Sequence, residues 1–216
     1  ADCRVERDTI TYNAAVSACD KGEQWVQALQ LFSEMADSRV ERNTIMYNAA
    51  VSACEKGEQW VWALQLFREM GEIRVERNTI TYTAAVSACE KGEQWLQALQ
   101  LFRKMADSRV KRDTIAYSAA VSACEKGEQW LQALQLFREM AVSRVERDTI
   151  TYNAAVSACE KGQQWVWALQ LFREMADSRV ERDAITFNAT VSSCEKGEQT
   201  VQALQVVREI AECSSE

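Results

Sequence analysis

The sequence repeats itself every 35 residues, and this period constrains the fold more than any other feature. The segment TITYNAAVSACDKGEQWVQALQLF recurs with few changes, beginning at Thr9, Thr44, Thr79, Thr114, Thr149 and, more loosely, Ala184. Self-similarity at periods of 20–50 residues is typical of stacked arrays in which each unit buries its apolar face against its neighbours. The sequence therefore predicts a repeat architecture rather than one globular core.

The period divides the chain into units of equal length. Residues 1–8 match the tail of a preceding repeat, and the full repeats span residues 9–43, 44–78, 79–113, 114–148 and 149–183. In residues 184–216 the usual Trp is Thr200, and the Leu-Phe pair is Val206-Val207. A smaller apolar face suits a terminal repeat, so this last unit is expected to be a degenerate capping repeat.

Each unit predicts two helices. The first spans Thr9–Lys21 in the first repeat; Asp8 or Thr9 is a suitable N-cap, and Gly22 is expected to end the helix in a left-handed conformation. After Gly22, apolar residues follow helical spacing at Trp25, Ala28, Leu29, Phe32, Met35 and Ala36. The expected fold is all-α: a right-handed α-solenoid superhelix of stacked helix–turn–helix repeats.

Composition argues against several functional classes. No apolar run is long enough to span a bilayer, so we expect no membrane insertion. The chain has no His, no glycine-rich phosphate loop and no CxxC motif. We therefore expect no catalytic activity, no metal site, no cofactor and no small-molecule substrate.

Six cysteines occupy one repeat position: Cys19, Cys54, Cys89, Cys124, Cys159 and Cys194. Equivalent atoms of stacked helices lie about 10 Å apart, whereas a disulfide requires Cα atoms within about 7 Å. These cysteines are therefore expected to be small buried residues of a tight helix contact.

The stretch ITYNAAVSACDKG followed by ALQLFSEM resembles the P-type pentatricopeptide repeat (PPR), and the resemblance covers the chain from end to end. The tetratricopeptide pattern of Trp, Leu, Gly and Tyr in the first helix does not fit. One departure is that the glycine usual in the family's terminal turn is replaced by Arg, as at Arg39.

The resemblance implies recognition of single-stranded RNA, one base per repeat, in the processing, stability or translation of RNA in a chloroplast or mitochondrion. In this family the residue after the Tyr and the last residue of the unit select the base. The implied pairs are Asn13 with Asn43, Asn48 with Asn78, Thr83 with Asp113, Ser118 with Asp148, and Asn153 with Asp183; Asn188 has its closing partner beyond Glu216. By the family's pairing rules the target resembles 5′-YYGGU-3′.

The resemblance implies one further row of RNA contacts, and the lysines that recur at the ends of the first helices form another. Residues expected to sandwich the bases are Ile10, Ile45, Ile80, Ile115, Ile150 and Ile185. Residues spaced to meet successive phosphates are Lys21, Lys56, Lys91, Lys126, Lys161 and Lys196.

Each row also has a purely structural interpretation. The closing Asp or Asn is a good N-cap, and the residue after the Tyr is also compatible with a solvated helix position. The lysines complement the helix dipoles, and the isoleucines suit packing. The residue after the Tyr or Phe varies only among Asn, Thr and Ser, and its partner only between Asn and Asp, which favours base readout. Drift also occurs elsewhere, at Met46, Thr81 and Ala116.

Net charge and tryptophans support a second hypothesis. The net charge of −7 and pI of about 4.9 are unusual for a nucleic-acid binder. Trp62 and Trp167 lie off the apolar stripe and are candidate protein contacts, whereas the expected inter-repeat core contains Trp25, Trp60, Trp95, Trp130 and Trp165. The alternative function is a protein-binding scaffold subunit of a large organellar complex, without RNA readout.

Overall fold

The computed structural model describes residues 9–37 and 42–213, which form helices joined by short turns. The tail assigned to residues 1–8, with Asp8, lies outside the described residues, as do Arg39 and residues 214–216. Within the described residues the helices are α1 Thr9–Lys21, α2 Trp25–Asp37, α3 Thr44–Lys56, α4 Trp60–Glu72, α5 Thr79–Lys91, α6 Trp95–Asp107, α7 Thr114–Lys126, α8 Trp130–Val142, α9 Thr149–Lys161, α10 Trp165–Asp177, α11 Ala184–Lys196 and α12 Thr200–Cys213.

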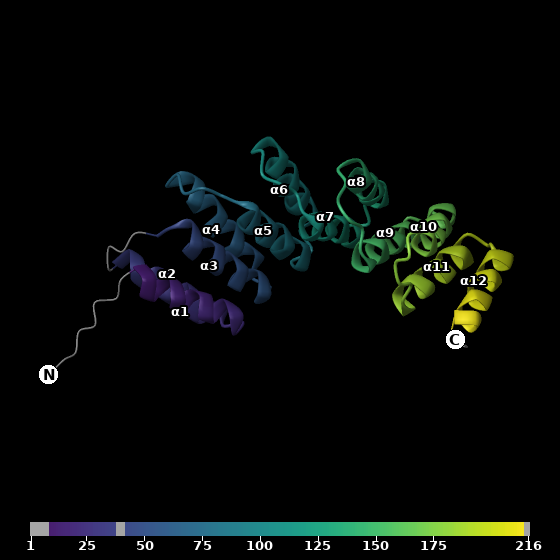
Figure 1. Cartoon of the computed structure of the whole chain (residues 1–216), viewed down its shortest axis with the longest axis horizontal. Coiled ribbons are helices and arrows are strands. Elements are labelled where there is room, and N and C mark those ends of the chain that lie inside the picture. Colours follow the sequence, from purple (N-terminus) through teal and green to yellow (C-terminus); the bar gives the residue numbers. More distant parts are fainter. Residues whose placement is uncertain (1–8, 38–41, 214–216) are drawn as a thin grey trace. The chain divides into compact units, whose positions relative to one another are not determined.

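The helices form two compact units, residues 1–112 and residues 113–216. In the first unit α1, α3 and α5 pack in sequence, each against its own second helix, and α2 and α4 also contact the first helix of the next repeat (Figure 1). The second unit has the same arrangement, with α7, α9 and α11 as first helices. Each unit is thus an α-solenoid of stacked helix–turn–helix repeats, and the all-α expectation is confirmed.

The first helix of a repeat begins where the preceding repeat closes. The Asn43 side chain accepts a hydrogen bond from the Met46 N–H at 3.1 Å, and Asp148 accepts from the Thr151 N–H at 2.9 Å. These contacts satisfy N–H groups of the first turn that have no partner within the helix. The same cap is present at Asn78, Asp113 and Asp183.

The ends of these helices correct one expectation. Gly22 is not left-handed: no described glycine has positive φ, and it is Glu23 that adopts φ 57°. The Gln24 N–H then donates to the Cys19 carbonyl at 2.8 Å, which closes a Schellman turn around the left-handed residue. The equivalent residues Glu58, Glu93, Glu128, Gln163 and Glu198 have φ between 55° and 57°.

The glycine is required for a close approach rather than for its own φ. A Cβ on Gly57, where φ is −79°, would collide with the ring of Trp25 from the preceding repeat. The same approach joins Gly92 to Trp60, Gly162 to Trp130 and Gly197 to Trp165. The prediction that these tryptophans form inter-repeat contacts is confirmed.

The inter-repeat core is completed by aromatic pairs and thiols. Phe32 meets Tyr47 of the next repeat edge-to-face at 4.9 Å between ring centroids, and the Arg42 guanidinium lies 4.4 Å from the Phe32 ring. Cys54 is fully buried and reduced, and burial raises the pKa of its thiol to about 12. Cys89, Cys124, Cys159 and Cys194 are also buried thiols, as expected for small residues in a tight helix contact, whereas Cys19 in the first repeat is only half-buried.

Candidate nucleic-acid interface

An exposed row of isoleucines lies on the first helices. Ile10 is 76% exposed, Ile185 is 58% exposed, and the other members, Ile45, Ile80, Ile115 and Ile150, fall between these values. The packing interpretation is therefore wrong for this row. Each isoleucine precedes the proposed base-selecting residue by three positions, so the two side chains lie on one face of the helix.

Two of the proposed base-selecting pairs are joined by direct contacts. Asn153 Nδ2 donates to Asp183 Oδ2 at 2.8 Å, and Ser118 Oγ lies 3.5 Å from Asp148 Oδ1. Asn153 is 9% exposed and Ser118 is 8% exposed. These two residues are not solvated helix positions, and each lies against the first helix of the following repeat.

The other proposed pairs are arranged differently. Asn48 Oδ1 accepts from Thr81 Oγ1 at 2.5 Å. Asn13 Oδ1 is buried and makes no hydrogen bond with any described residue. Thr83 is half-buried in the first unit, Asp113 caps α7 in the second unit, and Asn188 is exposed on α11.

Asp183 is held ionised by its hydrogen bonds. Burial disfavours its charge, but the Thr186 N–H and the Asn153 amide donate to it, and the Thr186 hydroxyl, whose one proton is shared with Asn153 Oδ1, lies 3.1 Å from it. Together these contacts lower the pKa of Asp183. An ionised carboxylate is only an acceptor. At neutral pH the groups that contact Asp183 must therefore be hydrogen-bond donors.

Sequence reasoning missed the third residue of each repeat. Thr151 Oγ1 lies 2.5 Å from Ser118 Oγ, and Thr186 Oγ1 donates to Asn153 Oδ1 at 2.5 Å. The signal was present in the sequence, because this is the position that varies at Met46, Thr81 and Ala116. Without the contacts between repeats, this variation is indistinguishable from drift.

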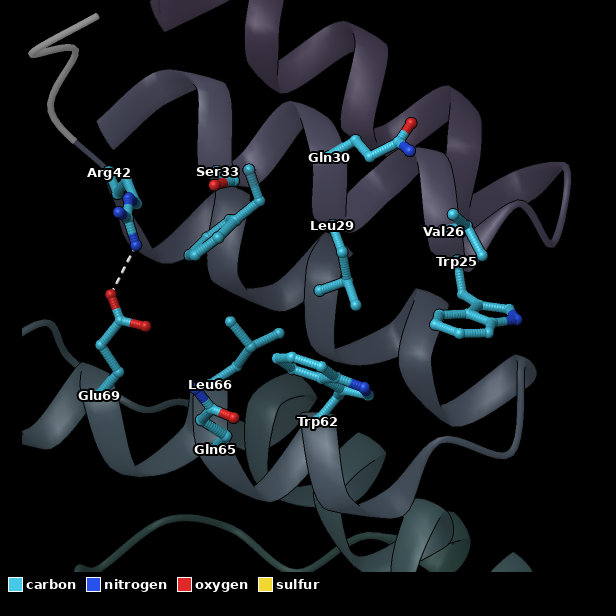
Figure 2. Close-up of a pocket in the computed structure, with 11 residues that line it drawn as sticks. Trp25, Val26, Leu29, Gln30, Ser33, Arg42, Trp62, Gln65, Leu66 and Glu69 are labelled. Carbon is cyan, nitrogen blue, oxygen red and sulfur yellow. Dashed lines mark hydrogen bonds and ion pairs between the residues drawn. The ribbon is translucent and has the colours of Figure 1, made fainter. Parts of the chain in front are cut away.

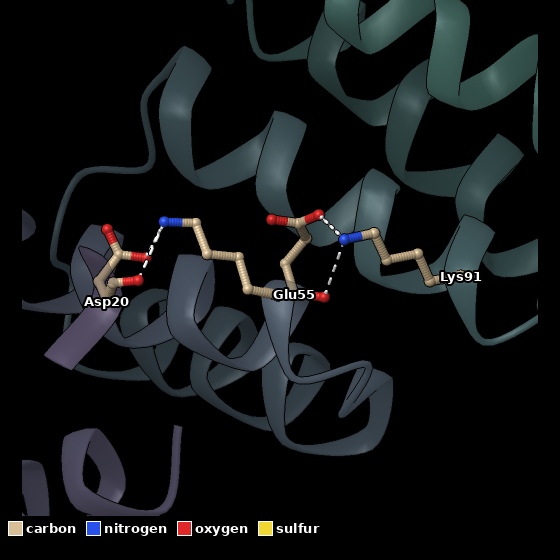
Figure 3. Close-up of polar contacts among 4 residues, drawn as sticks. Asp20, Glu55 and Lys91 are labelled. Atoms are coloured by element: carbon tan, nitrogen blue, oxygen red, sulfur yellow. Dashed lines mark hydrogen bonds and ion pairs between the residues drawn. The ribbon is translucent and has the colours of Figure 1, made fainter. Parts of the chain in front are cut away.

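The lysine row forms ion pairs between repeats (Figure 3). Lys91 Nζ lies 2.6 Å from Glu55 Oε1 and 3.4 Å from the Glu55 carbonyl oxygen, at the carboxyl end of the preceding first helix. The same pairing joins Lys56 to Asp20, Lys161 to Glu125 and Lys196 to Glu160. Lys21 and Lys126 are exposed at the ends of α1 and α7. Phosphates would have to compete with these carboxylates.

Arginines that precede the closing Asp or Asn are occupied in the same way. The Arg182 guanidinium lies 4.6 Å from the Phe172 ring centroid, and its Nη1 pairs with Glu209 Oε2 at 2.9 Å. Arg147 stacks on Phe137 and pairs with Glu174. Their positive charge is used in packing between repeats.

The off-stripe tryptophans lie in two different environments. Trp62 is 44% exposed and lines a groove of about 510 Å³ with Trp25 and Leu66, where the Arg42–Glu69 ion pair closes one end (Figure 2). Trp167 is half-buried, because the Arg138 guanidinium lies 4.3 Å from its ring centroid. The residue at the place of Arg138 in the first repeat is Ser33.

Residues 9–37 and 42–213 contain no cluster of three His, Cys, Asp or Glu side chains arranged for a metal ion. None of the described helices has the length and apolar character needed to cross a bilayer.

Comparisons with known proteins match this architecture. The sequence profile of the PPR repeat matches residues 10–40, 45–75, 80–110 and 115–145, and that of the pentatricopeptide repeat domain matches residues 132–210. None of the curated proteins matches the sequence.

Similar solved structures include maize PPR10 in complex with an 18-nt psaJ RNA element (17% identity, TM-score 0.56, 98% of this chain and 36% of PPR10). The PPR domain of Arabidopsis thaliana protein-only RNase P 1 in complex with tRNA is 15% identical, with TM-score 0.73, over 83% of this chain and 95% of that domain. Arabidopsis nuclear protein-only RNase P 2 is 10% identical, with TM-score 0.74, over 85% of this chain and 41% of that protein. These similarities concern the fold, and the chain spans about a third of the length of PPR10.

Proposed function

Because the chain belongs to the pentatricopeptide repeat family, we propose that it is a non-enzymatic binder of single-stranded RNA. Each repeat reads one base, and the preferred sequence is close to 5′-YYGGU-3′. The protein acts in RNA processing, stability or translation in a chloroplast or mitochondrion.

The observation that carries this proposal is the row of exposed isoleucines beside the base-selecting residues. Exposing a large β-branched side chain once in every repeat has no benefit for the fold, whereas covering one contributes about 1.5–3 kcal/mol. Ile150 lies one helical turn before Asn153, and Asn153 contacts the cap of the next repeat. A base that stacks on the isoleucine brings its edge to the polar pair.

Solved relatives give the proposal a precedent. PPR10 is in complex with an RNA element and the PPR domain of RNase P 1 is in complex with tRNA. Both proteins are distant from this chain in sequence. RNA binding by this chain, and the bases that the chain reads, are therefore part of the proposal.

The acidic net charge shapes the expected mode of binding. Because the lysine row is paired with carboxylates, few lysines are available to displace counterions from the RNA backbone. Affinity should therefore depend on stacking and base-edge hydrogen bonds, with a shallow dependence on salt.

The test is a fluorescence-anisotropy titration of the whole chain with a short labelled RNA containing 5′-CUGGU-3′. A second RNA of the same bases in permuted order is the control, and both are measured at about 50 and about 200 mM salt. Tighter binding to the first RNA supports base readout. Equal affinity for the two RNAs would show that the chain does not recognise this base order. Absence of binding to either RNA at the lower salt concentration would exclude RNA as the ligand.

A second candidate function, a protein-binding scaffold within a large organellar complex, is favoured by the groove around Trp62. In the second unit Arg138 covers Trp167, but Ser33 leaves the Trp62 ring open. The chemistry that completes this site is a guanidinium supplied by a partner, since cation–π stacking is strongest on Trp.

The scaffold candidate is tested with an arginine-containing peptide and the same peptide with Arg replaced by Gln. Binding of the first peptide alone, followed by Trp fluorescence, and its loss in Ser33→Arg would support the scaffold. The Ser33→Arg substitution places a guanidinium over Trp62 within the chain, so an unchanged peptide affinity would rule out this groove as the contact.

A further inference from the structure

A threonine links each of three base-selecting residues to the next repeat. Thr186 Oγ1 lies 2.5 Å from Asn153 Oδ1 and 3.1 Å from Asp183 Oδ1. Thr151 Oγ1 lies 2.5 Å from both Ser118 Oγ and Asp148 Oδ1. Thr81 Oγ1 contacts Asn48 Oδ1 in the same way, and all three threonines are fully buried.

In the fourth repeat these contacts fix the direction of the hydrogen bonds. The Asp148 carboxylate can only accept, so the Thr151 hydroxyl donates its proton to Asp148. Thr151 Oγ1 is then an acceptor for the Ser118 hydroxyl proton. With its proton engaged, Ser118 presents only lone pairs to an RNA base.

In the fifth repeat the same logic gives the opposite polarity. Asn153 must direct Nδ2 towards the Asp183 carboxylate, and its Oδ1 accepts from Thr186. One of the two Nδ2 hydrogens remains uncommitted. Asn153 therefore presents a donor to the base.

These polarities fit different base edges. Guanine offers N–H donors where adenine offers an acceptor nitrogen, so an acceptor at Ser118 selects guanine over adenine. Uracil offers carbonyl acceptors, which match the donor at Asn153.

We propose that the third residue of a repeat, as at Thr81, Thr151 and Thr186, is a specificity-determining residue that sets the hydrogen-bond polarity of the base-selecting residue in the preceding repeat. This inference rests on the proposed RNA-binding function and adds a third member to the two residues that read each base. The threonine acts through Asn or Ser and does not itself contact the base.

The first unit contains an internal contrast. Asn13 lies in the repeat before Met46, which has no hydroxyl at the third position, and Asn13 Oδ1 is buried without a hydrogen bond to the described residues. Asn48 lies before Thr81 and has its oxygen satisfied. The side-chain oxygen of the base-selecting Asn thus has a hydrogen-bond donor where the third residue of the next repeat is threonine, and lacks one where that residue is methionine.

The test measures the affinity ratio between RNAs with G and with A at the fourth base, 5′-CUGGU-3′ against 5′-CUGAU-3′, for the whole chain and for Thr151→Val. Valine has the shape of threonine, so the buried site stays filled, and the Asp148 cap on the Thr151 N–H is retained. The Ser118 hydroxyl then keeps only its long 3.5 Å contact with Asp148, so its proton becomes available to adenine, while its lone pairs can still accept from guanine. We expect the G-over-A ratio to fall roughly tenfold.

Two matched variants complete the design. Thr151→Ser keeps the hydroxyl and should restore the ratio, and Thr186→Val makes the same change one repeat away and should leave the fourth base unaffected. An equal ratio in the parent chain and Thr151→Val, with RNA binding intact, overturns this inference alone. A parent chain that binds neither RNA overturns the proposed function together with the inference. A fall in Thr186→Val equal to that in Thr151→Val shows a general loss of packing and also overturns it.

Discussion

At the residue scale, the closing Asp of the fifth repeat makes two contacts with one side chain. Asp183 accepts the Thr186 N–H at the start of α11, and its second oxygen accepts from Asn153 in the preceding repeat. The capping and base-readout interpretations are therefore compatible, because a carboxylate has two oxygens. The side chain proposed to select a base in the fifth repeat therefore also caps the helix of the next repeat.

A substitution at Ser118 should exchange the base read by the fourth repeat. In Ser118→Asn this repeat acquires the Asn, Asp and Thr arrangement of the fifth, where Asn153 contacts Asp183 and Thr186. We expect the preference to change from 5′-CUGGU-3′ to 5′-CUGUU-3′, by about tenfold in each direction. Competition anisotropy measures the two affinities, and Asn153→Ser should produce the reverse exchange at the fifth base. Retained preference for G would contradict the proposed pairing.

At the element scale, the turns store strain that glycine would relieve. Arg144 follows α8 with φ 54°, and Arg74, Arg109 and Arg179 adopt the same left-handed conformation. This conformation costs a non-glycine residue roughly 1–2 kcal/mol, and part of the relief is offset by the greater unfolded-state entropy of glycine.

We expect Arg144→Gly to raise the free energy of unfolding by about 0.5–1 kcal/mol, measured by urea denaturation. Arg144→Ala is the control, since it removes the same side chain and keeps the strained conformation. Equal stabilisation by Gly and Ala would show that the side chain, and not φ, is responsible.

The ion pairs between first helices should limit RNA affinity. Glu125 pairs with Lys161 at 2.6 Å, so Glu125→Gln frees a lysine at the cost of a partly exposed pair worth about 0–1 kcal/mol. We expect several-fold tighter RNA binding and a salt dependence steeper by about one phosphate contact. Anisotropy titrations over a range of salt concentrations measure both.

Glu128→Gln is the matched control for charge, because Glu128 is exposed in the turn and the fifth repeat carries Gln163 at that place. If the two variants tighten binding equally, net charge is responsible and the lysine row makes no phosphate contact.

At the scale of the whole molecule, the repeated thiols make stability sensitive to alkaline pH. Burial raises the pKa of Cys54, Cys89 and Cys159 from 9.0 to about 12. Between these values the unfolded chain releases protons that the folded chain retains, so stability falls as pH rises above 9. The loss is about 1.4 kcal/mol per thiol for each pH unit.

Urea denaturation at neutral pH and at about pH 10 tests this expectation. Replacing the three cysteines with Ala should flatten the alkaline part of the profile, although cavities lower stability at every pH. A slope that is unchanged by the replacement would assign the alkaline sensitivity to other groups, such as Tyr47, whose pKa is also raised by burial and by its hydrogen bond to Glu69.

Much of the molecule follows from its sequence by itself. The period, the helix pairs, the caps and the Trp contacts depend on patterns within one or two repeats, such as apolar spacing and an oxygen three residues before an N–H. Local patterns of this kind are legible because a helix satisfies its backbone within a few residues.

Only the tertiary structure decided what lies between repeats. The Ser118–Thr151 contact spans 33 residues and the Lys161–Glu125 pair spans 36, so both depend on how one repeat sits on the next. Variation at the third position of the repeat marks Thr151 but not its partner, and no pattern marks the lysine pair, because side-chain contacts across stacked helices depend on their packing distance and rotation. The same reason explains the correction at the helix-ending glycine, which the sequence predicts at Gly22 to be left-handed: at Gly57 of the next repeat the requirement for glycine comes from the Trp25 ring of the preceding repeat and not from the φ of the glycine.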